Sequence, residues 1–139
     1  MMEDYKNRLI QIFPAFFAAM FDILITIYFQ PQEYWNGNLK NHNEANPIGS
    51  FAMNESIYGI FIISVLWLII ILLMGIFLPK KWISYTSLFI LICHTLGGCS
   101  WIMINFGFQY QFILIGFNTF LFLKFNNISK LHSFNQHIR

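Results

Sequence analysis

Charged residues are scarce in this chain. Only 10% of its 139 residues are Asp, Glu, Lys or Arg, while 57% are hydrophobic and 17 are phenylalanine. Soluble domains carry about 25% charged residues, and a water-soluble core of this length could not bury so much apolar surface. The composition therefore excludes an ordinary soluble domain. The net charge of +2, without a basic stripe or a glycine-rich phosphate loop, also argues against nucleic-acid binding.

Cysteine and the common catalytic motifs are scarce as well. The two cysteines, Cys93 and Cys99, lie about 9 Å apart along the axis of one predicted helix, so they cannot form a disulfide with each other. The sequence has no zinc-type cysteine spacing, no His-Glu-x-x-His helix and no Gly-x-Ser-x-Gly elbow. The best-known hydrolase signatures are therefore missing.

Long apolar runs dominate instead. A transmembrane helix needs about 20 predominantly apolar residues, and the sequence predicts an all-α fold, a single membrane domain over residues 1–139 built as a four-helix bundle. The second run contains no Asp, Glu, Lys, Arg or His, and Pro79, Lys80 and Lys81 end it. The predicted spans are residues 9–29, 56–78, 82–103 and 108–125, with a loop at 30–54 and a polar tail at 126–139.

The basic residues orient these spans. Cytoplasmic loops carry an excess of Lys and Arg, and with four spans all but one of the basic residues fall on the same side. Both termini are therefore expected in the cytoplasm, and the 30–54 loop outside it. Seven residues lie on the first side, namely Lys6, Arg8, Lys80, Lys81, Lys124, Lys130 and Arg139, whereas Lys40 lies on the other.

An acidic residue interrupts the first span. Asp22 lies in the apolar run, where a charge costs roughly 2.5 to 3.5 kcal/mol even on lenient insertion scales, so it normally faces protein or water. Ala15, Ala18, Ala19, Asp22 and Thr26 share one helix face, and small residues on one face let helices pack closely in lipid. Asp22 is therefore expected on a packing face. In a purely structural role, it would bond a backbone carbonyl or a hydroxyl such as that of Thr26.

A histidine occupies a comparable position in the third span. His94 shares a face with Ser87, Gly97, Gly98, Trp101 and Asn105, and it lies roughly 18 Å along its helix, compared with roughly 20 Å for Asp22. We therefore expect the two side chains to meet, with Asn118 of the fourth span as a third member. A histidine beside a carboxylate tends to keep its proton. A purely packed His94, or an axial porphyrin ligand, is the alternative, so the cofactor stays open.

A second polar cluster lies in the 30–54 loop, just before the second span. It contains His42, Glu44, Asn46 and Pro47, and the Asn-Pro pair marks a turn. His42 and Glu44 are the residue types that bind metals, but two such residues in a hydrated loop are ordinarily solvated, so no metal site is expected. Asp22, Glu44 and His94 are the candidate catalytic residues if the protein is an enzyme.

Two family resemblances follow from these residues. Asp22-Ile23-Leu24-Ile25-Thr26, followed by Glu44-Ala45-Asn46-Pro47, resembles a domain-of-unknown-function family of small bacterial and archaeal membrane proteins that pair Asp-x-x-x-Thr with Glu-x-Asn-Pro. This resemblance implies one site formed by both motifs and a location in the cytoplasmic membrane of a bacterium or archaeon.

Lys81-Trp82-Ile83 with His94-Thr95 is similar to the four-helix family of sterol isomerases and sigma-2-type receptors, although the second span lacks the expected acidic residue.

Three classes of function remain open. The first is a subunit or ligand-binding scaffold of a membrane assembly, with other membrane subunits or further copies of the chain as partners, and the absence of catalytic motifs favours it. The second is an intramembrane hydrolase or isomerase that acts on a lipid or peptide with Asp22, Glu44 and His94. The third is a proton- or ion-coupled transporter that uses Asp22 and His94 as a relay. The expected ligand-binding residues are Asp22, Thr26, Asn46, His94 and Asn118.

Overall fold

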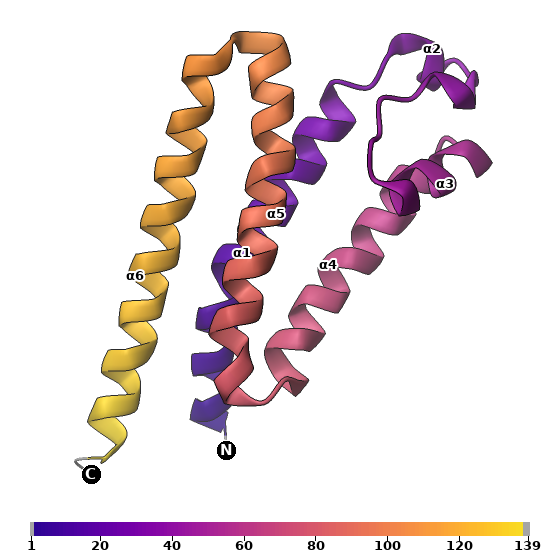
Figure 1. The fold of residues 1–139 in the computed structure, drawn as a ribbon. Helices are drawn as coiled ribbons and strands as arrows, with labels where there is room; N and C mark the ends of the chain where they lie inside the picture. Colours follow the sequence, from indigo (N-terminus) through magenta and orange to yellow (C-terminus); the bar gives the residue numbers. More distant parts are fainter. Residues whose placement is uncertain (1, 138–139) are drawn as a thin grey trace.

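The computed structural model describes the backbone of residues 2–137 and the side-chain surroundings of residues 5–131, and within them the chain is helical without strands. Four long helices make up most of the chain, and the second diverges from the third and fourth away from the turn that joins it to the third (Figure 1). Each is long and apolar enough to cross a membrane, so the predicted all-α fold with four such helices is confirmed. These helices are α1 (Met2–Tyr28), α4 (Gly59–Phe77), α5 (Lys80–Phe106) and α6 (Gln111–His137).

The predicted 30–54 loop is folded. It forms α2 (Gln32–Trp35), the 3-10 turn η1 (Leu39–Asn41) and α3 (Pro47–Glu55), while a second 3-10 turn, η2 (Phe108–Tyr110), links α5 to α6. The buried Tyr34 packs with Met53 and Ile60. Its hydroxyl donates to the carbonyls of Ser56 and Ile57, at 3.2 and 3.0 Å. These contacts attach the loop elements to the start of α4.

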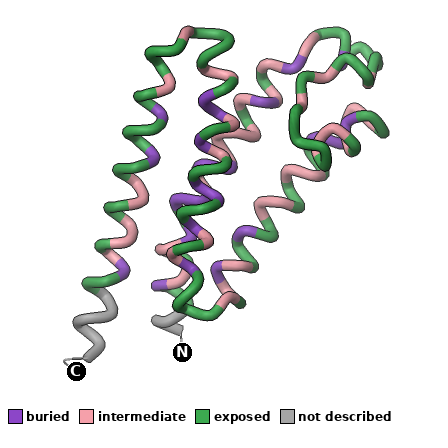
Figure 2. The backbone as a smooth tube through the Cα atoms, viewed as in Figure 1, coloured by how far each residue is buried: buried purple, intermediate pink, exposed green. Residues whose placement is uncertain are grey.

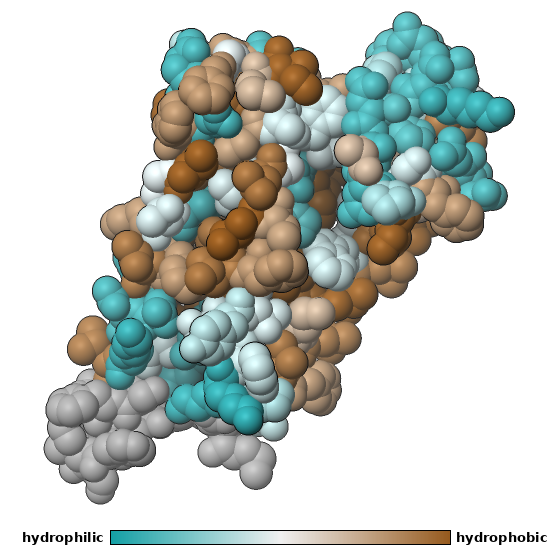
Figure 3. Space-filling view, in the orientation of Figure 1, coloured by the Kyte–Doolittle hydropathy of each residue, from teal (hydrophilic) through white to brown (hydrophobic). Residues whose placement is uncertain are grey.

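The bundle has two chemically different ends. The start of α1, the α4–α5 turn and the C-terminal part of α6 lie together at what we call the basic end, and α2, η1 and α3 lie at the opposite, loop end (Figure 1). Figure 3 shows hydrophilic side chains over the loop elements and mainly hydrophobic ones between the two ends. Many large apolar side chains on the long helices are exposed, for example Phe89 and Ile113 at 69% and 70%.

Helix α1 is the centre of the packing. It contacts α4, α5 and α6, and its alanine face is buried, as the small-residue pattern predicts. Burial is concentrated along α1 and α5 (Figure 2). Small side chains let helix backbones approach closely, so the polar groups on this face are brought near α5. The core cluster contains Ile12, Ala15, Ala19, Ile71 and Ile90.

Helices α1 and α6 are longer than the spans predicted from the sequence. Helix α1 begins at Met2, and α6 continues through the predicted polar tail to His137. The predicted boundaries follow the fall in hydropathy, but polar residues such as Lys124 and Asn127 do not end a helix, and no glycine or proline follows Gly116 in the chain. The last part of the predicted tail, including Arg139, lies outside the described residues.

Candidate functional site

Asp22 and His94 are in contact. Nδ1 of His94 lies 2.8 Å from Oδ2 of Asp22, and each side chain is 17% exposed. The two residues sit on parallel neighbouring helices, since α1 and α5 both run from the basic end to the loop end (Figure 1). The structure therefore brings together the pair that their similar depth predicts.

Trp67 of α4 is the third member of this network. Its indole nitrogen donates to Nε2 of His94 at 2.7 Å. Because an indole N–H can only donate, Nε2 must accept, and the proton of the ring lies on Nδ1, from which it is donated to Asp22. His94 is therefore neutral in this arrangement, in contrast to the expectation that it keeps a second proton beside the carboxylate.

Trp67 was not among the predicted site residues, because it lies in the most apolar span, where α4 has no Asp, Glu, Lys, Arg or His. A tryptophan there reads as a hydrophobic side chain. The available signal was chemical, since a buried indole N–H normally finds a hydrogen-bond acceptor. His94 is the acceptor that a neighbouring helix supplies.

Gly97 makes room for the carboxylate. A Cβ atom at this position would lie 2.6 Å from Oδ2 and 2.7 Å from Oδ1 of Asp22, which is closer than such atoms approach. Asp22 therefore rests against the backbone of α5, one turn above His94. The predicted α5 face contained Gly97, but only the structure shows that it accommodates Asp22.

Asn118 belongs to a different contact. Its amide donates to Oγ1 of Thr95 at 2.8 Å, and Thr95 donates in turn to the carbonyl of Leu91 at 2.6 Å. Thr95 follows His94 in the chain, and successive side chains on a helix point about 100° apart. The prediction that Asn118 completes the Asp22–His94 pair is therefore wrong, and Asn118 joins α6 to α5 instead. Its Oδ1 is buried without a partner among the described residues.

Buried polar residues lead from Asp22 toward the loop end. Thr26 follows Asp22 by four residues on the same side of α1 and is 7% exposed, and Gln30, two residues after the end of α1, is 6% exposed. Oε1 of Gln30 accepts from the backbone N–H of Asn43 at 2.9 Å, while its Nε2 is buried without a partner among the described residues. This series of polar residues thus ends beside the residue that precedes Glu44.

Glu44 and Asn46 organise the turn before α3. Oδ1 of Asn46 caps α3 by accepting from the N–H of Ile48 at 3.0 Å, and Oε1 of Glu44 accepts from the N–H of Asn46 at 2.7 Å. Burial raises the pKa of the Glu44 carboxyl, and the charge of Asp22 adds to this rise. Asn46 therefore serves as a helix cap, whereas Glu44 is electrostatically coupled to Asp22.

His42 has both ring nitrogens engaged within the loop. Nδ1 accepts from the N–H of Glu44, and Nε2 lies 3.2 Å from Oγ of Ser50. In the neutral ring the proton is therefore on Nε2 and is donated to Ser50, which is the wrong direction for a base that activates a serine. The described residues contain no group of three His, Cys, Asp or Glu side chains placed to hold a metal ion.

Comparison with known proteins identifies no family for this chain. The chain matches no protein-family model, no curated protein and no solved structure. The function is therefore inferred from the geometry of the site. That geometry consists of a positioned carboxyl group whose Oδ1 accepts no hydrogen bond from the described residues, a neutral histidine held at both nitrogens, and a second carboxyl group in the adjoining loop.

Proposed function

We propose that this chain is an integral membrane protein with four spans and both termini in the cytoplasm of a bacterium or archaeon. Four apolar helices support the spans, and the distribution of basic residues supports the orientation. Lys6, Lys81 and Lys130 belong to segments at the basic end, whereas Lys40 belongs to the loop end. The loop end then lies outside the cytoplasm.

Within that membrane, we propose a binding scaffold, either a ligand-binding protein or a subunit of an assembly. The observation that carries this proposal is the Trp67–His94–Asp22 network. It fixes one carboxyl oxygen and leaves Oδ1 of Asp22 as an acceptor without a partner among the described residues. Such a group suits an ammonium or another N–H or O–H donor from a ligand or a partner helix, because polar contacts between helices in lipid stabilise association.

The enzyme alternative has less support from the same geometry. A general acid or base must exchange a proton with the substrate, but both nitrogens of His94 are occupied by Trp67 and Asp22. Ser50 accepts a hydrogen bond from His42 rather than giving up its proton to it. The described residues therefore show no hydroxyl group that is activated by a histidine.

One observation favours the transporter as a second candidate. Asp22, Thr26, Gln30 and Glu44 connect the interior of the bundle with the loop end, and the charge of Asp22 affects the pKa of Glu44. A cation entering from the loop end would meet both carboxyl groups. Flux of protons or monovalent cations into liposomes, abolished by Asp22→Asn, would identify this function.

The scaffold proposal is tested by native mass spectrometry on untagged protein, gently extracted from its own membrane. We expect a stoichiometric ligand or partner subunit that Asp22→Asn loses and the exposed carboxylate control Glu33→Gln retains. Benzylammonium should raise the Tm of the stripped protein but not that of Asp22→Asn, with benzyl alcohol as the uncharged control. A folded Asp22→Asn variant that keeps the same bound species and the same response to benzylammonium would contradict the proposal.

A further inference from the structure

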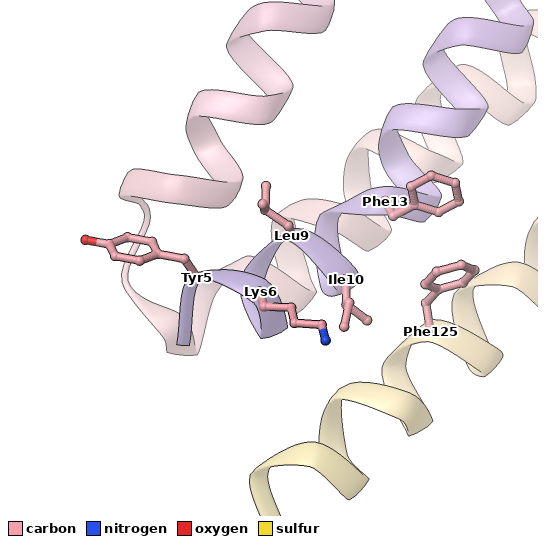
Figure 4. A pocket seen from close by; sticks show the side chains of 6 residues that line it. All are labelled: Tyr5, Lys6, Leu9, Ile10, Phe13 and Phe125. Atoms are coloured by element: carbon pink, nitrogen blue, oxygen red, sulfur yellow. The ribbon is translucent and has the colours of Figure 1, made fainter. Parts of the chain in front are cut away.

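An open groove lies at the basic end, beside the part of α1 that precedes the Asp22 site. It has a volume of about 470 Å³ and runs between the first turns of α1 and the middle of α6 (Figure 4). Its lining is mainly apolar, and its polar groups are the Lys6 ammonium and the Tyr5 hydroxyl. The lining residues are Tyr5, Lys6, Leu9, Ile10, Phe13 and Phe125.

Two aromatic rings close the inner end of the groove. Phe13 of α1 and Phe125 of α6 stack with their centroids 4.7 Å apart and their planes 28° from parallel. Figure 4 shows both rings beyond Ile10, on the side away from the chain terminus. Leu9 and Phe13 are each 40% exposed. The groove is therefore open to its surroundings and closed by aromatic rings at its deeper end.

Lys6 marks the outer end. Its ammonium group is directed toward the space between α1 and α6 in Figure 4, and no described carboxylate forms an ion pair with it. Arg8 differs, because it donates to the carbonyl of Ile76 at 2.7 Å. Seven positions separate Lys6 from Phe13, which is roughly 10 Å along a helix. This spacing suits a negatively charged group followed by the first part of a hydrocarbon chain.

We propose that this groove binds one anionic phospholipid from the leaflet at the basic end. The phosphate pairs with Lys6, and the upper part of one acyl chain lies along Leu9 and Ile10 as far as the stacked rings. Basic pockets between membrane helices are suited to anionic headgroups, and each lysine near the surface contributes about 1 kcal/mol. The inference rests on the proposed membrane insertion but not on the binding role of Asp22.

The experiment uses the full chain in detergent, with phosphatidylglycerol or phosphatidylcholine of the same acyl chains added before native mass spectrometry. The wild-type protein should retain one phosphatidylglycerol in preference to phosphatidylcholine. Lys6→Gln should lower this preference about fivefold, and Lys130→Gln, an exposed lysine on α6 outside the groove, should leave it unchanged. Equal losses in the two variants would show diffuse attraction to the basic end and would overturn the site.

A second pair of variants tests the apolar part. Ile10→Trp should fill the groove and remove the bound lipid, whereas Ile113→Trp, on an exposed position of α6, should not. A dimer that loses its contact in Ile10→Trp would show that a second copy occupies the groove and would refute the lipid proposal. Asp22→Asn should keep the phosphatidylglycerol, so failure of the lipid site and failure of the scaffold are measured separately.

Discussion

The proton on His94 is placed by a residue that does not ionise. Trp67 donates to Nε2, and Nδ1 donates to Asp22. We therefore predict that histidine ¹⁵N spectra of the protein at neutral pH show His94 as the neutral Nδ1–H form. In Trp67→Phe this constraint is lost, and the spectrum should change toward the Nε2–H or doubly protonated form. Trp82→Phe, at an exposed indole, is the control, and an Nε2–H signal assigned to His94 in the wild type would refute the assignment.

A single missing methyl group makes the Asp22 contact possible. Gly97→Ala would place a Cβ atom against both oxygens of Asp22, so the carboxyl group or the helix must shift. Overpacking of this kind costs about 1 to 3 kcal/mol, and we expect Tm to fall by roughly 5 to 10 °C. The matched control is Gly116→Ala on α6, where an added Cβ meets nothing within 4 Å. Equal Tm values for Gly97→Ala and wild type would contradict the close contact.

At the scale of elements, the loop segment couples the outer surface to the interior of the bundle. Tyr34 of α2 bonds the chain just before α4, Gln30 just after α1 bonds the chain before α3, and Glu44 stabilises the turn into α3. These bonds hold the Glu44 carboxyl in a partly buried position, where the charge of Asp22 helps to raise its pKa. The loop is therefore part of the site rather than a passive connection.

Because the Glu44 carboxyl is partly buried, the stability of the protein depends on pH. The pKa of Glu44 is raised above its ordinary value of 4.5, chiefly by burial, so the folded protein holds a proton that the unfolded chain has lost above that pH. The contribution to stability is full below pH 4.5 and is lost as pH rises through the folded-state pKa. Glu44→Gln should thus match the wild type near pH 4 and exceed its Tm by about 1 to 3 °C at pH 8.

The control for this measurement is Glu33→Gln, which removes an exposed carboxylate from α2 of the same loop segment. Thermal unfolding of the purified protein across pH 4 to pH 8, roughly the range over which a carboxyl with a raised pKa titrates, supplies both curves. A Tm difference between Glu44→Gln and wild type that is constant with pH would show that ionisation of Glu44 does not matter.

The helices and the Asp22–His94 pair could be predicted from the sequence because hydropathy and helical spacing are local patterns. The partners of that pair could not. Several residues of α4 and α6, Trp67 and Asn118 among them, are able to reach the interior. Which of them contacts Asp22 or His94 depends on how α4 and α6 are rotated against α1 and α5. Helix rotation about its own axis is set by packing at contacts distant in sequence, such as Ile12 against Gly75, which no spacing rule encodes.

At the scale of the whole molecule, the distribution of exposed apolar side chains favours insertion in a bilayer. Large hydrophobic residues are exposed on α4, α5 and α6, and they form a band between polar ends (Figure 3). A soluble monomer rarely exposes contiguous apolar patches beyond a few hundred Å². Lipid would cover this band, and the polar ends would then lie at the two interfaces.

The orientation can be measured with cysteine labelling. In a background with Cys93→Ala and Cys99→Ala, an impermeant maleimide should label Asn38→Cys in intact cells, because the loop end is expected outside the cytoplasm. Lys81→Cys, at the basic end, should react only after the membrane is opened. The reverse pattern would show that the topology is inverted, with the loop end on the cytoplasmic side and Asp22 approached from the cytoplasm. Labelling of both positions in intact cells would mean that the helices do not span the membrane, and the lipid groove would then lose its basis as well.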